Sequence, residues 1–369
     1  MAPQLNSNPL KGGFDLLLVG AGHAHLAVLH QWASHPASRP RGQIALLSAD
    51  AHAWYSGMLP GLLSGRYALD DCRIQLPALC AAANVELITG QACGLTPARK
   101  QLQLSDQQSL HYGCLSLNLG SLPQLPKQYG SGLQLLAVKP FSSFIAQWQH
   151  WQQQPQALAI VGGGAAGVEL ALALAPQLPA ISLFSARRLL SGHPPALRQR
   201  ALAHLSRAGV QVREQCRVDE VLDQQLLSAG QVVWHGQRAI VASGASALPW
   251  LQRSDVVCDE QGFVRIDATL QSSSHASIFA VGDCASLAHT PHNGVYAVRQ
   301  GAVLAHNLAA HLQAQPLRTY RPQPRALALL ATGDGGALAS WAGLTCEGKL
   351  LGYWKDRLDQ GFMQRHSLG

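Results

Sequence analysis

The stretch Ala159-Ile160-Val161-Gly162-Gly163-Gly164-Ala165-Ala166-Gly167-Val168-Glu169-Leu170 lies near the middle of the chain and carries a G-x-G-x-x-G pattern. Gly162 permits a tight turn after an apolar strand, Gly164 lets a pyrophosphate approach the backbone, and Gly167 lets the following helix pack on the strand. The pyrophosphate then lies at the helix N-terminus, where N–H groups and the helix dipole favour negative charge. The pattern therefore predicts a dinucleotide-binding loop, although a tight turn without a ligand would use the same glycines.

Two other stretches repeat parts of this pattern. Residues 14–19 are an apolar run that leads into Gly20-Ala21-Gly22-His23-Ala24-His25, where His25 stands at the position expected for the third glycine. We expect the helix to pack farther from the strand there, or the imidazole to fill the gap. Near residue 280, Ser277-Ile278-Phe279-Ala280-Val281-Gly282-Asp283 is a short apolar strand that ends on Gly-Asp.

Two glycine loops and a late Gly-Asp, in this order, resemble the two-dinucleotide-binding-domain flavoproteins of the pyridine nucleotide-disulfide oxidoreductase superfamily. The resemblance implies that the first loop binds FAD, the middle loop binds NAD(P)H, and Gly282 and Asp283 contact the FAD. It also implies an α/β fold class with two Rossmann-like dinucleotide-binding domains and a small C-terminal α+β unit. The expected domains are an FAD-binding domain in two parts, 1–125 and 246–312, an NAD(P)-binding domain, 126–245, and a C-terminal unit, 313–369.

Apolar runs and helix breakers predict the order of the elements. We expect strands at 14–19, 43–48 and 181–185, helices at 22–34, 195–208 and 294–312, and a hairpin formed by 217–227 and 231–235. Residues 122–137, which are rich in Pro, Gln and Gly, are predicted to be a linker, and the Pro-rich stretch 315–325 is predicted to be another.

The segment after the second strand narrows the resemblance. Three stretches are similar to the flavoprotein module fused to some selenide, water dikinases. They are Tyr55-Ser56-Gly57-Met58-Leu59-Pro60-Gly61, Leu115-Ser116-Leu117-Asn118-Leu119-Gly120-Ser121 and Trp354-Lys355-Asp356. More distant similarity is to type II NADH dehydrogenases and sulfide:quinone oxidoreductases. Disulfide reductases of the superfamily carry their redox cysteine pair in this segment, but residues 52–65 contain no cysteine. Because thiol–disulfide exchange needs two thiols beside the flavin, that chemistry is disfavoured.

Both dinucleotide domains lack the usual acid that bonds a ribose hydroxyl at the end of the second strand. In the first domain Ser48 takes this place, and Asp50 either substitutes for the acid or serves as a turn residue. In the second domain Ser185 stands at the position of this acid, and Arg187 and Arg188 follow it. Basic side chains here suit the 2′-phosphate of NADPH, but solvated arginines at a helix start would give the same pattern, so NADH and NADPH both stay open.

The resemblance adds other cofactor-binding residues. Lys139 lies in a Val-Lys-Pro segment that approaches the flavin in relatives, although a surface lysine is an equal interpretation. Gly244 follows the strand that closes the NAD(P) domain, and Ala297 lies on the helix that points at the flavin. His23 and His25 belong to the FAD loop in the relatives and are not interpreted as a metal pair.

Candidate catalytic residues lie after the middle loop and on the helix at 294–312. A glutamate at the position of Glu169 faces the flavin and nicotinamide in type II NADH dehydrogenases. By resemblance it orients the nicotinamide or relays a proton with a raised pKa; otherwise it only interacts with the helix dipole. Where those relatives have A-Q-x-A-x-Q, this chain has Val295 and Arg299 in place of the glutamines. Tyr296, Arg299 and Gln300 are therefore candidate contacts for a different acceptor.

The composition excludes several classes of function. The 369 residues are 47% hydrophobic and 13% charged, which suits two or three folded domains. The net charge of +7 is scattered without basic runs, so no nucleic-acid partner is implied. The 8 cysteines and 16 histidines show no metal-ligand spacing. The polar residues 1–13 do not resemble a signal peptide, and no apolar run approaches the length of a membrane span. We therefore expect a cytoplasmic protein.

An apolar stripe near the C-terminus leaves one question of location open. Leu351, Trp354, Leu358 and Phe362 stand at helical spacing. Such a stripe usually packs on its own protein, which is the interpretation we prefer. Related quinone reductases instead use C-terminal amphipathic helices to attach to the inner face of a membrane. The oligomeric state stays open.

Together these features predict a non-covalent FAD flavoprotein that oxidises NAD(P)H and reduces a quinone or another small acceptor. A reductase in selenium metabolism is one alternative, and it rests on the fusion analogy alone. A flavin-binding redox sensor with little turnover is the other, because the acceptor motif and the ribose-binding acid are both altered.

Overall fold

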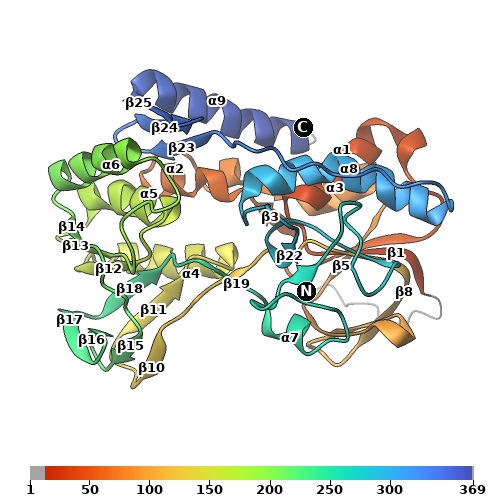
Figure 1. Cartoon of the computed structure of the whole chain (residues 1–369), viewed down its shortest axis with the longest axis horizontal. Coiled ribbons are helices and arrows are strands. Elements are labelled where there is room, and N and C mark those ends of the chain that lie inside the picture. The colour runs from red at the N-terminus through yellow and green to blue at the C-terminus, as the bar shows by residue number, and fades with distance from the viewer. Residues whose placement is uncertain (1–12, 368–369) are drawn as a thin grey trace, which may run out of the picture. The chain divides into compact units, whose positions relative to one another are not determined.

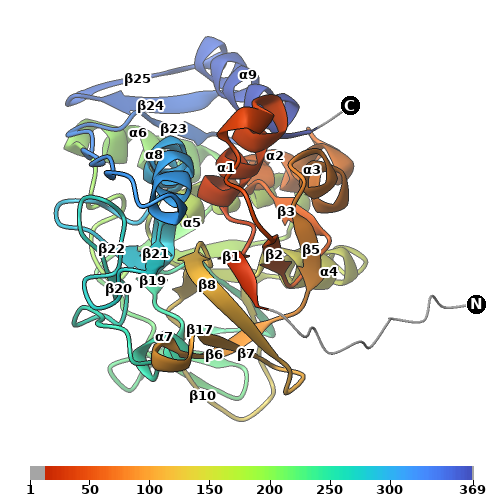
Figure 2. The same ribbon diagram turned by 90° about the vertical axis from the view of Figure 1, so that its right-hand side faces the viewer.

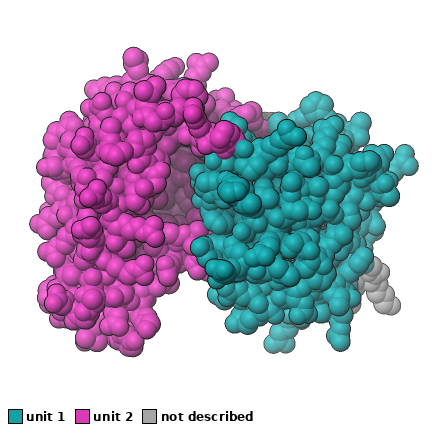
Figure 3. All heavy atoms as spheres, in the orientation of Figure 1, with its two compact units in different colours: residues 1–53, 75–120, 247–322 teal, residues 54–74, 121–246, 323–369 magenta. Residues whose placement is uncertain are grey.

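Strand–turn–helix segments recur in two parts of the chain, and the computed structural model groups them into two compact units (Figure 3). The structure describes residues 13–367, so most of the predicted polar stretch 1–13 lies outside the described residues. Unit 1 comprises residues up to Ala53, Gln75–Gly120 and Ala247–Pro322, and unit 2 comprises Trp54–Ile74, Ser121–Ser246 and the residues from Gln323 onward. The predicted first FAD segment, 1–125, thus includes residues 54–74, which cluster with unit 2.

Unit 1 is built on a largely parallel sheet. Its strands are β1 (Phe14–Val19), β2 (Ile44–Ser48), β5 (Glu86–Thr89), β6 (Ala92–Thr96), β7 (Gln101–Leu104), β8 (Ser109–Leu117) and β21 (Ile278–Ala280). The order is β5-β2-β1-β8-β7-β6, with β21 paired to β8. β1 runs parallel to β2 and β8, and β21 runs parallel to β8, so four strands end at one edge. Residues 16–19, 44–47 and 278–280 of these strands are apolar and almost wholly buried, as a two-sided parallel strand requires.

Helices α1 (His23–Ser34), α3 (Leu76–Ala82) and α8 (Gly294–Leu312) pack together over this sheet (Figures 1 and 2). α1 and α8 approach closely because Gly301 has no side chain: a Cβ there would lie 2.6 Å from the Cβ of Ala27. The remaining elements of unit 1 are α7 (Pro249–Gln252), β20 (Val264–Arg265) and β22 (Ala285–Ser286). β3 (His52–Trp54) and β4 (Arg73–Gln75) lie where the chain passes from one unit to the other.

Unit 2 is built on a second parallel sheet, in the order β11-β18-β12-β13-β14. Its strands are β11 (Gln134–Ala137), β12 (Leu158–Val161), β13 (Ile181–Phe184), β14 (Gln211–Arg213) and β18 (Arg238–Val241). One face packs on α4 (Phe141–Gln152), α5 (Ala165–Leu174) and α6 (Pro195–Arg207), and that core includes Phe144, Trp148, Ile160 and Leu183. The other face packs on a small sheet of β10 (Lys127–Tyr129), β15 (Glu220–Leu222), β16 (Gln225–Ser228) and β17 (Gln231–His235).

The C-terminal part belongs to unit 2. A hairpin sheet of β23 (Ala328–Ala331), β24 (Ala337–Trp341) and β25 (Leu344–Gly348) leads into α9 (Lys349–His366). Leu330 and Leu338 of this sheet enter the same core as α5 and α6. The short helix α2 (Leu59–Leu63) also packs on α5, which explains why residues 54–74 cluster with this unit.

Most of the predicted elements are confirmed, and two predictions are wrong. The strand at 14–19 and the helix at 294–312 have the predicted bounds. Residues 122–137 are not a linker, because they contain β9 (Leu122–Pro123), β10 and β11, which pair with β19 (Ala245–Ser246), β15 and β18. The predicted hairpin at 217–235 is three strands. In the first case partners distant in sequence stabilise strands that local composition does not favour. In the second case a tight turn divides the first predicted strand into β15 and β16, which pair with each other.

Candidate functional site

The first glycine loop lies at the carboxyl edge of the unit 1 sheet, between the ends of β1 and β8. Gly20 has φ +88°, and a Cβ on it would lie 2.5 Å from the carbonyl oxygen of Asn118. A Cβ on Gly22 would lie 2.4 Å from Oδ1 of the same residue. Both glycines are therefore required so that the end of β8 can approach the loop. Ligands bind at this edge in open α/β sheets.

Asn118 connects three elements of unit 1 with one buried side chain. Its Oδ1 accepts hydrogen bonds from the backbone N–H groups of Ala24 (3.1 Å) and His25 (3.2 Å) in the first turn of α1. Its Nδ2 donates to the carbonyl oxygen of Val281 (3.0 Å), just after β21. The side chain thereby sets the position of the helix N-terminus relative to the Gly-Asp segment, and the sequence analysis did not select it.

His25 supports the loop from behind. The imidazole is wholly buried; Nδ1 donates to the carbonyl oxygen of Gly20 (2.6 Å) and Nε2 accepts from the hydroxyl of Ser116 (2.8 Å). A carbonyl can only accept, so the bonds define the neutral tautomer with the proton on Nδ1. Burial lowers the pKa of His25 to about 4, and the bond to Gly20 opposes this only partly. The imidazole fills the gap left by the missing glycine and does not reach a ligand surface.

The other predicted residues of unit 1 gather at the same edge. Ser48 ends β2, and the hydroxyl accepts from the backbone N–H of Asp50 at 3.4 Å, while Asp50 bonds the backbone and ring of His52. Gly282, with φ +69°, donates its N–H to Oε1 of the buried Gln300 (2.7 Å), so α8 holds the turn that presents Asp283. The sequence predicts Gln300 as a candidate acceptor contact, and the structure places it as a buried partner of the Gly282 backbone.

The N-terminal part of α8 carries Tyr296, Ala297 and Arg299. Asn293 caps this helix, because its side chain accepts from the N–H of Val295 (3.0 Å). Tyr296 and Ala297 are buried, Arg299 is exposed, and His23 is half-buried near Gly294. Burial raises the pKa of Tyr320. The charge of Arg299 opposes this rise and Tyr296 adds to it, so both side chains act on Tyr320.

The middle glycine loop lies at the carboxyl edge of the unit 2 sheet, between β12 and β18. A Cβ on Gly162 would lie 2.2 Å from the carbonyl oxygen of Ala242, and one on Gly167 would lie 1.8 Å from that of Gly162. A Cβ on Gly164, the N-cap residue of α5, would meet no described protein atom within 4 Å. Gly162 and Gly167 thus serve the packing of the loop, whereas Gly164 opens a cradle above the helix N-terminus. The exposed Gly244 lies at the same edge, beyond β18.

Lys139 and the segment after β13 complete this edge. Lys139 follows β11, and its Nζ donates to the hydroxyl of Ser121 (3.2 Å). Ser185 is buried beside the glycine loop, and a Cβ on Gly163 would lie 2.0 Å from its Oγ. Arg187 and Arg188 follow and are exposed. The structure therefore brings the predicted residues of each unit together at the carboxyl ends of that unit's strands.

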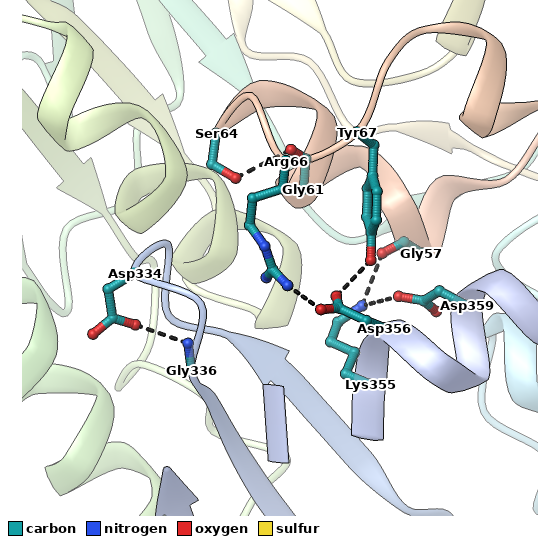
Figure 4. Close-up of polar contacts among 10 residues, drawn as sticks. All are labelled: Gly57, Gly61, Ser64, Arg66, Tyr67, Asp334, Gly336, Lys355, Asp356 and Asp359. Atoms are coloured by element: carbon teal, nitrogen blue, oxygen red, sulfur yellow. Dashed lines mark hydrogen bonds and ion pairs between the residues drawn. The ribbon is translucent and has the colours of Figure 1, made fainter. Parts of the chain in front are cut away.

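A polar cluster in unit 2 joins the middle loop helix to the C-terminal helix. We define the α9 cluster as Tyr55, Glu169, Lys355 and Asp359. Nζ of Lys355 donates to Oδ2 of Asp359 (2.7 Å) and to the carbonyl oxygen of Gly57 (2.9 Å), as Figure 4 shows. The hydroxyl of Tyr55 donates to the other oxygen of Asp359 (3.1 Å). Glu169 accepts from the backbone N–H of Ala331 (2.8 Å).

Burial and charge shift the pKa values in this cluster. Burial raises the pKa of Glu169 to about 7, although the ammonium of Lys355 and the N–H of Ala331 favour the carboxylate. Burial also raises the pKa of Asp359 despite its bonds from Lys355 and Tyr55. Burial acts against the ammonium of Lys355, but Glu169 and Asp359 outweigh it and raise its pKa. The cluster can thus hold or release a proton near neutral pH.

The segment at residues 55–67 is held to α9 by a second set of bonds. Asp356 accepts from the guanidinium of Arg66 and from the hydroxyl of Tyr67 (2.5 Å) (Figure 4). The ring of Tyr55 stacks on Phe362 with centroids 4.3 Å apart. The Tyr-Ser-Gly-Met-Leu-Pro-Gly segment and the Trp-Lys-Asp segment, which carried the family resemblance, are therefore spatial partners.

The exposed side of α9 carries four large apolar side chains. Leu350, Tyr353, Trp354 and Leu358 are 86%, 65%, 43% and 46% exposed, whereas Phe362 is 4% exposed. We call these four exposed residues the α9 face. The predicted stripe therefore does not pack on its own protein as a whole. No helix in the part of the chain that the structure describes is long and apolar enough to cross a membrane. Within residues 13–367, no group of three His, Cys, Asp or Glu residues could hold a metal ion.

Comparison with known proteins agrees with this geometry. A family model described as pyridine nucleotide-disulphide oxidoreductase matches residues 14–301. Ferroptosis suppressor protein 1 of Taeniopygia guttata is 26% identical over 63% of this chain and 65% of that protein. Demethylphylloquinone reductase NdbB of Synechocystis sp. is 28% identical over 68% of this chain and 67% of that protein. The chain thus spans only about two thirds of these curated relatives.

A solved structure shows the same fold. The sulfide:quinone oxidoreductase of Aquifex aeolicus superposes with a TM-score of 0.77 and covers 95% of this chain and 91% of its own. The sequence identity is 16%, so this likeness concerns the fold alone.

Proposed function

This chain belongs to the pyridine nucleotide-disulphide oxidoreductase family, whose members bind FAD and NAD(P)H, and we propose that it transfers electrons from NAD(P)H through FAD to a quinone. The fold of the family, with two Rossmann-like dinucleotide-binding units, is the fold described above. The flavoprotein oxidation of NAD(P)H follows from the family. The quinone as acceptor and the roles of individual residues are the parts that we propose.

The residues at the two sheet edges fit these cofactors. In unit 1, Gly20, Gly22 and the start of α1 would hold the FAD pyrophosphate, and Ser48, Asp50 and Asp283 would bond its hydroxyl groups. In unit 2, Gly162, Gly164 and the start of α5 would hold the pyrophosphate of NAD(P)H. The open space above Gly164 supports this assignment, because that glycine has no packing role within the described protein. When bound, FAD accepts a hydride from NAD(P)H and passes the electrons on.

The α9 cluster, which joins Glu169 on α5 to Lys355 and the buried Asp359 on α9, is the observation that carries the choice of a quinone. Reduction of a quinone to a quinol consumes two electrons and two protons, so its site needs a group that exchanges protons near neutral pH. Glu169, with a pKa raised to about 7, meets this need. In our proposal Lys355 stabilises the carboxylate after the proton has left, and Asp359 and Tyr55 position Lys355. The name of the Synechocystis relative agrees with a quinone acceptor.

Residues of α8 have a separate role in the proposal. The helix N-terminus and Arg299 would stabilise negative charge on the reduced flavin, and Tyr296 would contact the acceptor or the flavin. In our proposal the α9 cluster carries the proton chemistry, and Val295 and Arg299 replace the two glutamines of the type II NADH dehydrogenase motif.

Rapid mixing of the reduced protein with a water-soluble quinone tests this proposal. We expect the variant Glu169→Gln to be reduced by NAD(P)H within about threefold of the wild-type rate but to be reoxidised by quinone roughly 10²- to 10⁴-fold more slowly, the usual contribution of a general acid. Glu220→Gln, on β15 of the same unit, is the matched control and should change neither step. Equal reoxidation in Glu169→Gln and wild type would refute the role of the cluster. Reduction without reoxidation by any acceptor in the wild type would favour a redox sensor.

We further propose that the α9 face contacts a membrane surface, where a quinone would be available. Leu350, Tyr353, Trp354 and Leu358 form an exposed apolar surface, and the exposed Lys349 and Arg357 carry positive charge beside it. Sedimentation with vesicles that contain anionic lipid should bring down the wild type, and the variant Leu350→Glu/Tyr353→Glu should stay in the supernatant. Val232→Glu, an exposed apolar position on β17, is the control. Failure of the wild type to sediment with any vesicle would remove this part of the proposal.

A further inference from the structure

The turn after α2 presents two side chains toward α9. The carbonyl oxygen of Gly61 accepts from the N–H of Arg66 (2.8 Å) and from the hydroxyl of Ser64 (3.1 Å), which fixes the chain directly before Tyr67 (Figure 4). A Cβ on Gly61 would lie 2.3 Å from Cε2 of Tyr67. The glycine is therefore needed so that the ring of Tyr67 can lie against α2.

We call Arg66, Tyr67 and Asp356 the clasp. The hydroxyl of Tyr67 donates to Oδ1 of Asp356 (2.5 Å), and the guanidinium of Arg66 is ion-paired with Oδ2 (Figure 4). Both oxygens of the carboxylate are thus occupied, and Arg66 balances its charge. Charge-assisted bonds fix direction as well as distance, so the clasp holds α9 in one position against the turn.

A second tyrosine–aspartate bond lies about one helical turn farther along α9. The hydroxyl of Tyr55 donates to Asp359 (3.1 Å), and a Cβ on Gly57 would lie 2.8 Å from the ring of Tyr55. Asp356 and Asp359 stand at positions i and i+3 and therefore share one side of the helix. Two tyrosines of residues 55–67 thus bond two aspartates of α9, and a rotation of the helix would break both bonds.

Lys355 takes its direction from these contacts. Its Nζ donates to the carbonyl oxygen of Gly57 (2.9 Å) and to Oδ2 of Asp359 (2.7 Å), so its stem crosses from α9 to residues 55–67. Asp356 is the next residue in the chain, and the clasp therefore sets the point from which this stem starts. The side chain of Lys355 is only 12% exposed, so it depends on these protein acceptors more than on water.

The position of this ammonium determines the charge that Glu169 meets. Burial raises the pKa of Glu169 to about 7, and the ammonium of Lys355 opposes this rise whereas Asp359 adds to it. Tyr55 faces Glu169 from residues 55–67, and β23 contributes the N–H of Ala331. The attraction between Lys355 and Glu169 weakens as the distance between their charges increases.

We propose that Arg66, Tyr67 and Asp356 are positioning residues for the quinone half-reaction, because the clasp fixes α9 so that the ammonium of Lys355 stays beside the proton donor Glu169. The inference rests on the proposed function, since it assumes that Glu169 gives a proton to the quinone. It goes beyond that function by assigning a role to three residues that act only through Lys355.

Two measurements test the proposal, and one of them needs no turnover. Carbon-13 NMR of the FAD-loaded protein, labelled in the glutamate carboxyl groups, gives the pKa of Glu169 directly. The chain has only six glutamates, and the Glu169→Gln variant identifies the resonance. The pH dependence of reoxidation by a water-soluble quinone reports the same group during the reaction. Thermal denaturation measures the stability of each variant.

The variants change the clasp without changing a charge. Tyr67→Phe removes one hydroxyl, and Gly61→Ala displaces the ring of Tyr67 with one methyl group. Tyr129→Phe, at an exposed tyrosine of β10, is the matched control for the hydroxyl. Gly192→Ala, at an exposed glycine of the same unit, is the matched control for the methyl group.

We expect the pKa of Glu169 to rise by about 0.5–1 in Tyr67→Phe and in Gly61→Ala, because the carboxylate loses part of the stabilisation that a nearby cation supplies. The fall in the reoxidation rate should move to higher pH by the same amount. Below about pH 6 the rate should decrease about two- to tenfold, since a weaker acid transfers its proton more slowly. Reduction by NAD(P)H should stay within about twofold of the wild-type rate, and both controls should match the wild type.

An unchanged pKa of Glu169 in Tyr67→Phe would overturn the inference, even if the Tm falls, because the clasp would then serve stability alone. This outcome would leave the proposed function intact. A wild-type protein in which Glu169 does not titrate near pH 7, or in which Glu169→Gln is reoxidised as fast as the wild type, would instead refute the proposed function.

Discussion

Two glycines of the middle loop, Gly164 and Gly167, should respond in opposite ways to the same substitution. Gly164 has φ −80° and open space at its Cβ, so Gly164→Ala costs only the preference of an N-cap for glycine over alanine. We estimate a change in the free energy of unfolding within about 1 kcal/mol. A Cβ on Gly167 would lie 1.8 Å from the carbonyl oxygen of Gly162, where 3.4–4 Å is ordinary contact. Relief of this overlap should cost about 1–3 kcal/mol.

These free energies translate into measurable changes in Tm. For a unit of this size, 1 kcal/mol corresponds to roughly 2–4 °C, so Gly167→Ala should lower Tm by about 2–12 °C and Gly164→Ala by no more than about 4 °C. For ligand binding the order of the two variants should be reversed, so that Gly164→Ala has the larger effect. The methyl group of Gly164→Ala occupies the space assigned to the pyrophosphate, and we expect the Kd for NAD(P)H to rise at least about tenfold in a folded protein.

Circular dichroism melting and calorimetric titration with adenosine 5′-diphosphate measure the two effects separately. Gly192→Ala, at an exposed glycine of the same unit whose Cβ also meets no described atom within 4 Å, is the matched control and should change neither quantity. Unchanged ligand affinity in Gly164→Ala would refute the assignment of the open space to a pyrophosphate. An undiminished Tm in Gly167→Ala would refute the packing argument.

Three other perturbations have definite outcomes. Asn118→Ala leaves the N–H groups of Ala24 and His25 and the carbonyl oxygen of Val281 without their partner. Urea denaturation should show a loss of about 2–4 kcal/mol in the free energy of unfolding, and FAD should bind more weakly. Retention of wild-type stability would contradict this. The pKa of His25 is about 4 in the folded protein and 6.5 in the unfolded chain, so the neutral imidazole contributes fully to stability above pH 6.5. As the pH falls to 4, about 3 kcal/mol of the free energy of unfolding should be lost. A His25→Gln variant should lack this pH dependence. Glu169, with a pKa near 7, donates a proton only when protonated, so reoxidation by quinone should be constant below about pH 6 and fall about tenfold per pH unit above pH 8; a flat profile in the wild type would contradict the role of Glu169.

The glycine loops were predictable because their function constrains local residues. Gly167 avoids a clash with the carbonyl oxygen of Gly162 in the same short motif, so this requirement appears in neighbouring positions of the sequence. Gly162 avoids a clash with the carbonyl oxygen of Ala242, which is distant in sequence, but the tight turn at Gly162 is itself a local requirement. The parallel strands were predictable for a similar reason, since burial on both faces produces continuous apolar runs such as residues 14–19. The strands β9, β10 and β11 were not, because pairing with distant strands stabilises them.

The α9 cluster illustrates what a single sequence does not reveal. Lys355 and Asp359 lie about two hundred residues from Glu169, and no spacing rule connects them. Both segments were noticed through the family resemblance, yet only the packing of α5, residues 55–67 and α9 in one unit places the charges together. Asn118 was part of a quoted stretch too, but an asparagine after a strand is as typical of a turn as of a bond to three elements.

Anaerobic stopped-flow absorbance of the flavin, first with NADPH or NADH and then with a quinone, tests the central claim most directly. The account predicts that the donor bleaches the FAD absorbance and that quinone restores it within the same experiment, with restoration slowed in Glu169→Gln. Retention of the oxidised flavin spectrum in the presence of both donors would contradict the account, because the middle loop would then hold no productive nicotinamide dinucleotide.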